Sequence, residues 1–253
     1  MIATAGLYDA LAPIYDAWQA WNGMTPFARV AAAKLLPILE REAQARAGGD
    51  HLALLDAGCG TGTLLLEVAR AHPDWRLAGA DASTGMLAVA QAKAAGGGIG
   101  WARAGLDALP FASAFDACTI FYDTLNHLPD GAALAGVFAA AAAVLRPRGL
   151  LVFDVTSWTG FEHWWDGTSR FRGNGWRMIL EARFDRAREV ATGDITLEHG
   201  TVTGRYRIRE RYFPRAEIQT ALASAGFAVE QQEAWSPFPL GGLGKAWWTA
   251  RLR

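Results

Sequence analysis

A glycine-rich segment near residue 58 combines residue types that suit the binding of a small ligand. Residues 54–62 read Leu-Leu-Asp-Ala-Gly-Cys-Gly-Thr-Gly, so an apolar run ends in a carboxylate and three spaced glycines follow. Glycine lets the backbone bend sharply and approach a ligand where a Cβ atom would collide, and a helix that begins directly afterwards offers unpaired N–H groups. We expect a nucleotide-like ligand in contact with Asp56, Gly58, Cys59, Gly60 and Gly62.

The spacing of the glycines distinguishes between two classes of ligand. A dinucleotide-binding turn has the pattern Gly-x-Gly-x-x-Gly, in which the start of the helix faces a pyrophosphate. Here Thr63 stands where the third glycine belongs, and Asp56 lies beside the turn. Its carboxylate would repel a pyrophosphate but attract a cation. The pattern therefore favours a positively charged ligand.

A second acidic residue lies where a nucleoside ligand would need one. Residues 75–80 form a predicted strand that ends at Asp81, about 20 residues after the turn, where such folds place the carboxylate that accepts both ribose hydroxyls. In the next run, 82–87, Ser83 is a plausible N-cap. We expect Asp81 to bind the ribose and Ala82 and Met86 to lie in the same site. The alternative is that Asp81 caps a turn or helix.

These segments resemble the first two motifs of the class I S-adenosylmethionine-dependent methyltransferases. In that family the glycine turn packs against the methionine part of the cofactor, whose sulfonium and ammonium are both positive. The resemblance spans nearly the whole chain and is closest at residues 54–62, 75–87, 115–128 and 146–154. It implies S-adenosyl-L-methionine as the cofactor, S-adenosyl-L-homocysteine as the product, and Met86 near the adenine.

The third motif of the family is less regular here. Residues 104–110 resemble the acidic loop before Leu-Pro, but Gly105 occupies the position of the adenine-facing carboxylate. The resemblance leaves two ways to contact the adenine: Asp107, two residues later, or the backbone of Gly105 and Leu106. Asp107 could equally be a solvated loop residue.

The segment 115–128 resembles a subgroup of this family that methylates small molecules. It matches the pattern Phe-Asp…Asp-x-Leu-Asn-[Tyr/His]-Leu, and ligands sit at the carboxyl ends of parallel strands. The resemblance places Tyr122 and Asp123 beside the cofactor and Asn126 and His127 toward the methyl acceptor. A base is needed only if the acceptor loses a proton, and His127, Asp123 or a tyrosine could serve. His127 could instead be a surface or packing residue.

The N-terminal segment offers aromatic side chains that could close the site. Residues 8–16 are similar to the Tyr-x-x-x-Ala-x-x-Tyr-Asp segment that caps the cofactor in many of these enzymes. Tyr8 and Tyr15 are therefore candidate cofactor contacts, and Tyr15 is also a candidate catalytic residue. An apolar-aromatic stripe that only packs against the core is an equal alternative.

Alternating elements should position these residues. We predict helices at 7–21, 26–46, 62–71, 83–95 and 131–145, and strands near 52–57, 75–80, 99–103, 115–121 and 148–155. The pattern predicts an α/β fold with a parallel sheet covered by helices on both faces. With the resemblance it implies a Rossmann-like seven-stranded sheet, in which 1–155 form the N-terminal helices and the cofactor-binding core and 214–253 add the last helix and two strands.

Residues 156–213 break the alternation. Segments such as 177–184 and 202–211 look like antiparallel strands, with turns at 173–175 and 199–200, and we expect them to form a lid. Period-two alternation puts four arginines on one face of the last strand, opposite Tyr206, Ile208 and Glu210. The arginines form either a solvated or salt-bridged sheet face or a site for an anionic acceptor; they are Arg205, Arg207, Arg209 and Arg211.

Tryptophan placement gives the best clue to the acceptor. Of 11 tryptophans in the chain, Trp158, Trp164 and Trp165 follow the fifth strand at the expected mouth of the cleft. Indole rings shape apolar pockets and keep an N–H for orientation, so we expect these three to bind an organic acceptor. They could instead be core residues.

Composition bounds the remaining classes. The chain has 253 residues, 51% of them hydrophobic, and a formal net charge of −1, so no global field draws it to nucleic acid or an anionic membrane. Its 2 cysteines have neither metal nor disulfide spacing, and no apolar run is long enough to span a membrane. We expect a soluble cytoplasmic protein without metal, nucleic-acid or membrane partners, and we leave a homodimer open.

The resemblance implies in-line transfer of a methyl group to a nitrogen, oxygen or carbon nucleophile of a small organic acceptor. We expect the acceptor to be aromatic or amine-containing, for example a natural-product intermediate. Two alternatives remain open, a binding protein that keeps the cofactor site without turnover and a nicotinamide-dependent oxidoreductase. Cofactor titration and an acceptor panel would separate them.

Overall fold

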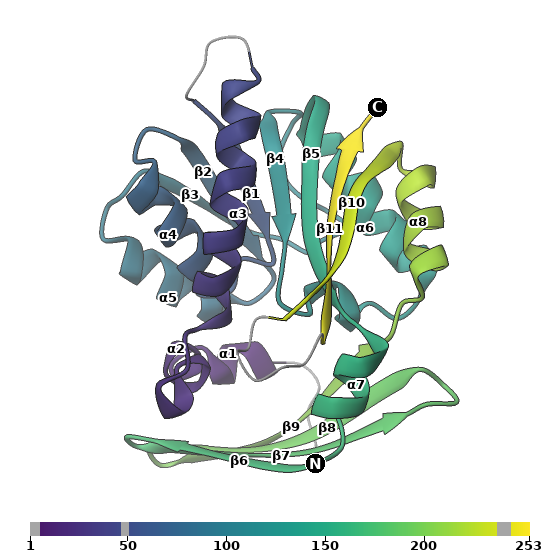
Figure 1. The fold of residues 1–253 in the computed structure, drawn as a ribbon. Coiled ribbons are helices and arrows are strands. Elements are labelled where there is room, and N and C mark those ends of the chain that lie inside the picture. The colour runs from purple at the N-terminus through teal and green to yellow at the C-terminus, as the bar shows by residue number, and fades with distance from the viewer. Residues whose placement is uncertain (1–5, 47–50, 237–243) are drawn as a thin grey trace.

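The computed structural model describes residues 6–46, 51–236 and 244–253, which build two sheets (Figure 1). The main sheet has seven strands in the order β10-β11-β5-β4-β1-β2-β3. Its strands are β1 (Ala53–Ala57), β2 (Arg76–Asp81), β3 (Ile99–Arg103), β4 (Phe115–Ile120), β5 (Leu145–Thr156), β10 (Phe227–Trp235) and β11 (Lys245–Leu252). Strands β1 to β5 are parallel, whereas β11 runs antiparallel to β5 and β10. The predicted Rossmann-like sheet is confirmed.

The central strands are buried along their whole length because both faces of the sheet are covered. Every residue of β1 and β4 is buried, as expected for parallel strands between two helical layers. On one face lie α3 (Phe27–Gln44), α4 (Thr63–Ala71) and α5 (Thr84–Ala94), and on the other lie α6 (Gly131–Val144) and α8 (Arg215–Ser224). None of the described helices is both long and apolar enough to cross a membrane.

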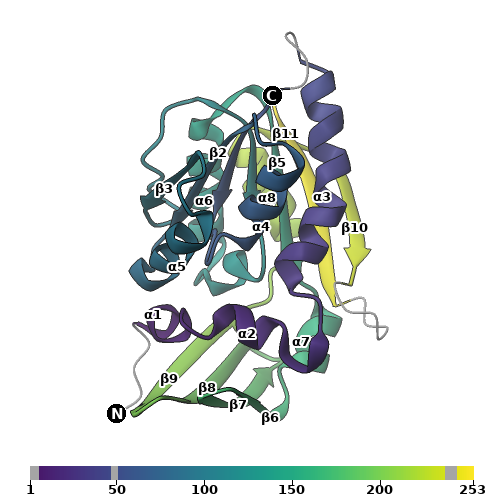
Figure 2. The ribbon, with the colours of Figure 1, turned by 90° about the vertical axis from the view of Figure 1, so that its left-hand side faces the viewer.

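The first helical segment is broken, in contrast to the single helix expected at 7–21. The structure has α1 (Leu7–Leu11), α2 (Tyr15–Gln19) and the short 3-10 helix η1 (Trp21–Gly23). Pro13 explains the break, because proline has no N–H and its ring clashes with the preceding helical turn. Figure 2 shows α1 and α2 between the main sheet and the second sheet.

The second sheet is antiparallel, in the order β6-β7-β8-β9. Its strands are β6 (Gly167–Gly173), β7 (Trp176–Asp185), β8 (Val190–His199) and β9 (Val202–Arg211). The predicted turns at 173–175 and 199–200 are confirmed, with positive φ angles of 75° at Gly175 and 58° at Gly200. The sequence analysis did not predict α7 (Trp158–Trp164) before this sheet. The division into three domains at 155 and 213 stays a prediction.

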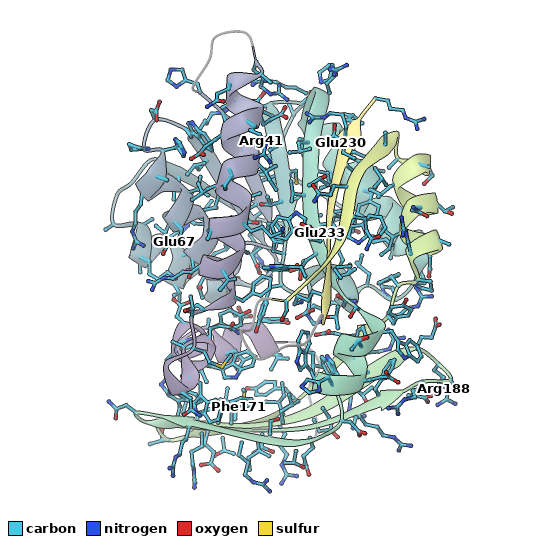
Figure 3. All side chains as sticks on the ribbon, viewed as in Figure 1. Arg41, Glu67, Phe171, Arg188, Glu230 and Glu233 are labelled. Atoms are coloured by element: carbon cyan, nitrogen blue, oxygen red, sulfur yellow. The ribbon has the colours of Figure 1, made fainter. Side chains whose placement is uncertain are left out.

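The two faces of the second sheet differ. Its inner face packs on the N-terminal helices, where Trp176, Met178 and Ile195 join Leu7 and Leu11 in one apolar cluster. Figure 3 shows Phe171 of β6 on this side, and its ring lies 5.2 Å from that of Trp21 between centroids.

The outer face carries the arginines of β9. Arg205, Arg207 and Arg209 are exposed, and Arg207 Nε lies 2.7 Å from Asp194 Oδ1 on β8. The predicted alternation is therefore confirmed, and these arginines lie on an exposed sheet face that is salt-bridged at Arg207 and points away from the N-terminal helices.

Candidate cofactor and acceptor site

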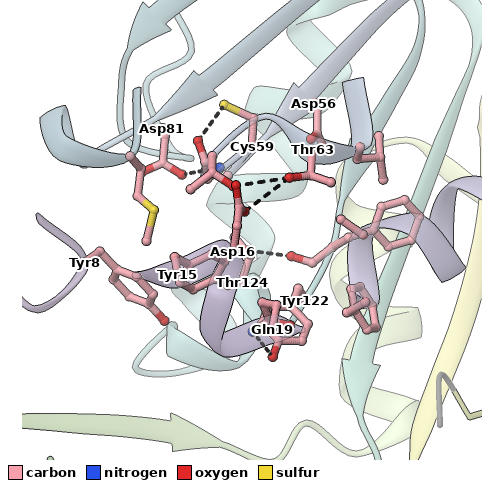
Figure 4. A pocket seen from close by; sticks show the side chains of 18 of the residues that line it. Tyr8, Tyr15, Asp16, Gln19, Asp56, Cys59, Thr63, Asp81, Tyr122 and Thr124 are labelled. Atoms are coloured by element: carbon pink, nitrogen blue, oxygen red, sulfur yellow. Dashed lines mark hydrogen bonds between the residues drawn. The ribbon is translucent and has the colours of Figure 1, made fainter. Parts of the chain in front are cut away.

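A cavity of about 280 Å³ lies at the carboxyl ends of β1, β2 and β4 (Figure 4). This is the point where the strand order reverses, at which open α/β sheets bind ligands. The structure brings together many of the residues predicted from the sequence. Those that line the cavity are Tyr8, Tyr15, Asp56, Gly58, Cys59, Gly60, Asp81, Ala82, Met86, Leu106, Tyr122 and His127.

The glycine turn is hydrogen-bonded to the neighbouring strand β2, and its glycines have different roles. The N–H groups of Gly58 and Cys59 both donate to the carbonyl oxygen of Ala80, at 2.7 and 3.0 Å. Gly60 has a φ of 52° and faces open space, so it lets the turn bend beside the cavity. Gly62 does not line the cavity. A Cβ there would lie 2.5 Å from the ring of Trp101, so Gly62 is needed for packing instead of the expected ligand contact.

Asp81, the last residue of β2, points its carboxylate at the glycine turn. Its Oδ2 accepts the N–H of Gly60 at 2.9 Å, and its Oδ1 accepts the N–H of Ser83 at 2.8 Å. Each carboxylate oxygen can accept a further hydrogen bond. Ser83 also caps α5, as expected, by accepting the N–H of Met86 at 3.1 Å. The carboxylate is thus held rigidly, with acceptor capacity left for two ribose hydroxyls.

The carboxyl of Asp56 is buried, and no ion pair with a cationic side chain is found for it among the described residues. It is 4% exposed, and its Oδ1 accepts the hydroxyl of Thr119 at 2.7 Å. Burial raises the pKa of Asp56 to about 7. A cation placed beside this buried carboxyl in the cavity would stabilise its ionised form.

The N-terminal helices are fastened over the cavity by side chains that the sequence analysis did not select. Asp9 accepts the hydroxyl of Ser83 at 2.6 Å. Asp16 accepts the hydroxyl of Thr61 and the ammonium of Lys93, both at 2.6 Å. Each of these aspartates directly follows a predicted tyrosine, so the repeated Tyr-Asp pair was the signal that could have identified them.

His127, in the short 3-10 helix η2 (Thr124–His127), connects the cavity to the second sheet. Its Nε2 lies 2.6 Å from the hydroxyl of Tyr8, and its Nδ1 lies 3.3 Å from the carbonyl oxygen of Arg209. A carbonyl oxygen can only accept, so Nδ1 carries the proton and Nε2 accepts the hydroxyl of Tyr8. Burial lowers the pKa of His127, which keeps the imidazole neutral and able to take a proton.

Asp123 lies beside the cavity and not in its lining. Its Oδ1 is 2.5 Å from the ammonium of Lys245, which also lies 2.8 Å from Asp154 Oδ2. Tyr122 and Asp123 both have a φ of 60°, a strained conformation for residues with side chains. Asp154 Oδ1 accepts the N–H of Tyr122 at 2.6 Å. The structure thus gives Asp123 a place in an ion-pair cluster that holds this strained loop, where a cofactor contact or catalytic role was expected.

Asn126 is fully buried, where contact with the acceptor was expected. Its amide nitrogen donates to the carbonyl oxygen of Arg211 at 2.8 Å, and its Oδ1 accepts the N–H of Thr156 at 2.9 Å. Both ends of the amide are therefore used to join η2 to β9 and β5, which is a structural role.

The three tryptophans expected in the acceptor pocket pack elsewhere. Trp158 lies 5.0 Å from Phe184 and 5.3 Å from Tyr212 between ring centroids, and these rings belong to an aromatic cluster that joins α7 to the second sheet. Trp164 and Trp165 pack against the same cluster. None of these tryptophans lines the cavity; neither does Asp107, which is exposed. Phe27 and Phe121 also line the cavity, although neither was predicted as a site residue.

Part of the chain matches known methyltransferases in sequence. Residues 54–149 match the methyltransferase domain family. A protein of Geobacillus sp. described as a methyltransferase is 35% identical over 161 residues, a stretch that covers 62% of this chain and 57% of that protein. The chain therefore spans a little over half the length of that relative.

Solved structures match almost the whole chain in fold. The CcbJ methyltransferase from Streptomyces caelestis has a TM-score of 0.75 at 19% identity, covering 97% of each chain. CalS10, an amino pentose methyltransferase from Micromonospora echinaspora solved with S-adenosylmethionine bound, has a TM-score of 0.70 at 24% identity, covering 95% of this chain and 97% of that chain. Residues 54–149 thus match a methyltransferase domain, and the chain as a whole has the fold of S-adenosylmethionine-dependent methyltransferases.

Proposed function

We propose that the protein transfers a methyl group from S-adenosylmethionine to a small organic acceptor. The observation that carries this proposal is the pair of carboxyl groups, Asp56 and Asp81, on either side of a glycine turn in one cavity. The two groups suit a ligand with a ribose at one end and positive charge at the other. The matching methyltransferase domain at 54–149 supports the same reading.

The cavity fits the parts of this cofactor. Asp81 would accept the ribose hydroxyls, and Ala82, Met86 and Leu106 would enclose the adenine beyond it. Asp56 would face the ammonium of the methionine part. The fastened helices α1 and α2 would exclude water above the methionine and ribose. When bound, the cofactor supplies a methyl group that is already activated on a sulfonium, so the protein mainly aligns the reactants.

The acceptor end of the site favours a neutral or cationic nucleophile over an anion. Tyr8, Tyr122 and His127 line it, and the carboxyls of Asp123 and Glu210 raise the pKa of Tyr8 through their charge, although burial raises it more. The exposed arginines of β9 lie on the other face of the second sheet. An amine-bearing acceptor suits this arrangement best, and CalS10, one of the fold relatives, is named as an amino pentose methyltransferase.

An acceptor panel tests the proposal. The purified protein is incubated with S-adenosylmethionine and separate pools of amines, phenols and carbon nucleophiles, and release of S-adenosylhomocysteine is measured. We expect release with the amine pool. Tight cofactor binding without release from any pool would favour a binding protein that does not turn over, and binding of a nicotinamide cofactor instead would favour an oxidoreductase.

The ionisation of Asp56 should make cofactor affinity depend on pH. With a pKa of about 7, the Asp56 carboxyl is protonated below neutrality and loses its attraction for the ligand ammonium. The affinity for S-adenosylhomocysteine should therefore fall as the pH falls through 7, by up to about tenfold per pH unit. Calorimetric titration between pH 5.5 and 8.5 measures this. Asp56→Asn should flatten the dependence, whereas Asp107→Asn, at an exposed carboxyl, should not.

Loss of the Tyr8–His127 hydrogen bond should slow turnover once an acceptor is known. We expect His127→Gln to lower kcat by roughly 100-fold or more, because general-base groups contribute at least that much. Tyr8→Phe should do the same, and the double variant should be little worse because the two groups act in series. His163→Gln, at an exposed histidine of α7, is the control. An unchanged kcat in His127→Gln would show that no proton passes through this pair.

A further inference from the structure

Glu210 is a buried carboxyl to which the proposed function assigns no step of the reaction. It lies on the inner face of β9, is 3% exposed, and its Oε2 has no hydrogen-bond partner among the described residues. Its Oε1 lies 3.9 Å from Nε2 of His127. A buried carboxyl with an unsatisfied oxygen is unfavourable unless another group or a change of charge compensates it.

The surroundings of Glu210 contain more carboxyls than cations. The titratable groups coupled to it or to His127 are Asp123 before η2, Asp154 on β5, Lys245 on β11, Tyr8 on α1 and Tyr122 after β4. Lys245 is already paired with Asp123 and Asp154. Burial, together with the charge of Asp123, raises the pKa of Glu210 well above its usual value. Burial therefore favours the protonated form of Glu210, and positive charge nearby favours its carboxylate.

Methyl transfer brings positive charge close to Glu210. The acceptor nitrogen forms a bond to the methyl carbon as the carbon–sulfur bond breaks, and the electron pair of that bond stays on sulfur. The N–H proton of the acceptor then passes to the oxygen of Tyr8 while the hydroxyl proton of Tyr8 passes to Nε2 of His127. One positive charge begins on the sulfonium and ends on the imidazolium of His127, 3.9 Å from Glu210.

We propose that Glu210 is the counter-charge of this reaction: it is neutral in the empty site, releases its proton to the solvent when the sulfonium arrives, and as a carboxylate stabilises the imidazolium of His127. This inference rests on the proposed function and deepens it. Glu210 is a positioning residue because it acts through His127, and it does not line the cavity. In its carboxylate form its charge nevertheless reaches the cavity, since that charge raises the pKa of Tyr8 in the lining.

The inference can be tested without knowing the acceptor. S-adenosylmethionine and S-adenosylhomocysteine share the ribose and the ammonium but differ by the sulfonium charge, so the response of Asp56 to the ammonium cancels between them, and the Glu210 variants separate the response of Glu210 to the sulfonium from that of Asp56. Titration calorimetry in buffers of different ionisation enthalpy gives the number of protons released on binding. We expect S-adenosylmethionine to release up to about one proton more than S-adenosylhomocysteine near neutral pH. Glu210→Gln should abolish this difference and Glu210→Asp should retain it.

The matched control is Glu198→Gln, at an exposed glutamate of β8 paired with Arg177, which should keep the wild-type difference. Binding of both ligands with no difference in the wild type, or with the same difference in Glu210→Gln, would overturn the role of Glu210. Failure of the wild type to bind either ligand would instead refute the proposed function itself.

If Glu210→Gln does not fold, NMR of wild-type protein labelled with carbon-13 at the glutamate side-chain carboxyl groups tests the same inference. One resonance should move from the position of an acid to that of a carboxylate with S-adenosylmethionine and not with S-adenosylhomocysteine. Absence of that movement would also overturn the inference.

Discussion

Asp81→Ala should weaken the binding of S-adenosylhomocysteine by roughly 100-fold or more. Hydrogen bonds to a charged group contribute about 1.5–3 kcal/mol each, and the Asp81 carboxylate would make two with the ribose. The substitution also leaves the N–H of Gly60 without the acceptor that holds the glycine turn. Both effects act on ligand affinity and are measured directly by calorimetry.

Two further variants make this result specific. Asp81→Asn keeps the shape of the side chain but removes its charge, so it should lose part of the affinity. Asp74→Ala, at an exposed aspartate just before β2, should bind like the wild type. Thermal unfolding checks that the variants are folded. Unchanged affinity in folded Asp81→Ala would contradict the assignment of the ribose site.

Lys245→Met should lower the free energy of unfolding by about 3–5 kcal/mol, the usual effect of removing one partner from a buried ion pair. Lys245 is 2% exposed and lies between Asp123 and Asp154, with the rings of Phe27 and Tyr122 around its ammonium. Without it, two neighbouring carboxylates repel each other and the strained loop after β4 loses its anchor. The midpoint of thermal unfolding should fall by roughly 6–20 °C.

The pH dependence and two controls identify the cause. Burial raises the pKa of Asp154, and Lys245 opposes that rise. In Lys245→Met the carboxyl should bind protons more tightly in the folded than in the unfolded state, so stability should recover as the pH falls toward 4. Asp154→Asn in the same chain should restore part of the loss, and Lys34→Met, at a partly exposed lysine, should have little effect. Equal losses in Lys34→Met and Lys245→Met would refute the buried cluster.

The parts of the site that could be predicted from the sequence are those marked by a pattern of neighbouring residues. The glycine turn, Asp81 and the Ser83 cap each lie within a few residues of the strand or helix that positions them. The alternation of apolar strands and helices then placed β1, β2 and β4 side by side, because parallel strands joined by helices bring their carboxyl ends to one edge.

The remaining parts depend on contacts between residues that are far apart in the chain, which a pattern of neighbouring residues does not indicate. Asp123 is 122 residues from Lys245 in the chain, so its pairing was not visible from the segment that contains it. The tryptophans near residue 160 looked suited to a pocket, but α7 turns them onto the second sheet. Pro13 was a signal within the expected first helix, and its effect explains why two short helices cross the cavity where one long helix was predicted.

A crystal structure with S-adenosylhomocysteine bound would show whether this cavity is the cofactor site. We expect the ribose hydroxyls to lie within hydrogen-bond distance of the Asp81 carboxylate and the sulfur to face Tyr8 and His127. A ligand bound outside this cavity, or a sulfur atom that faces away from Tyr8 and His127, would contradict this expectation.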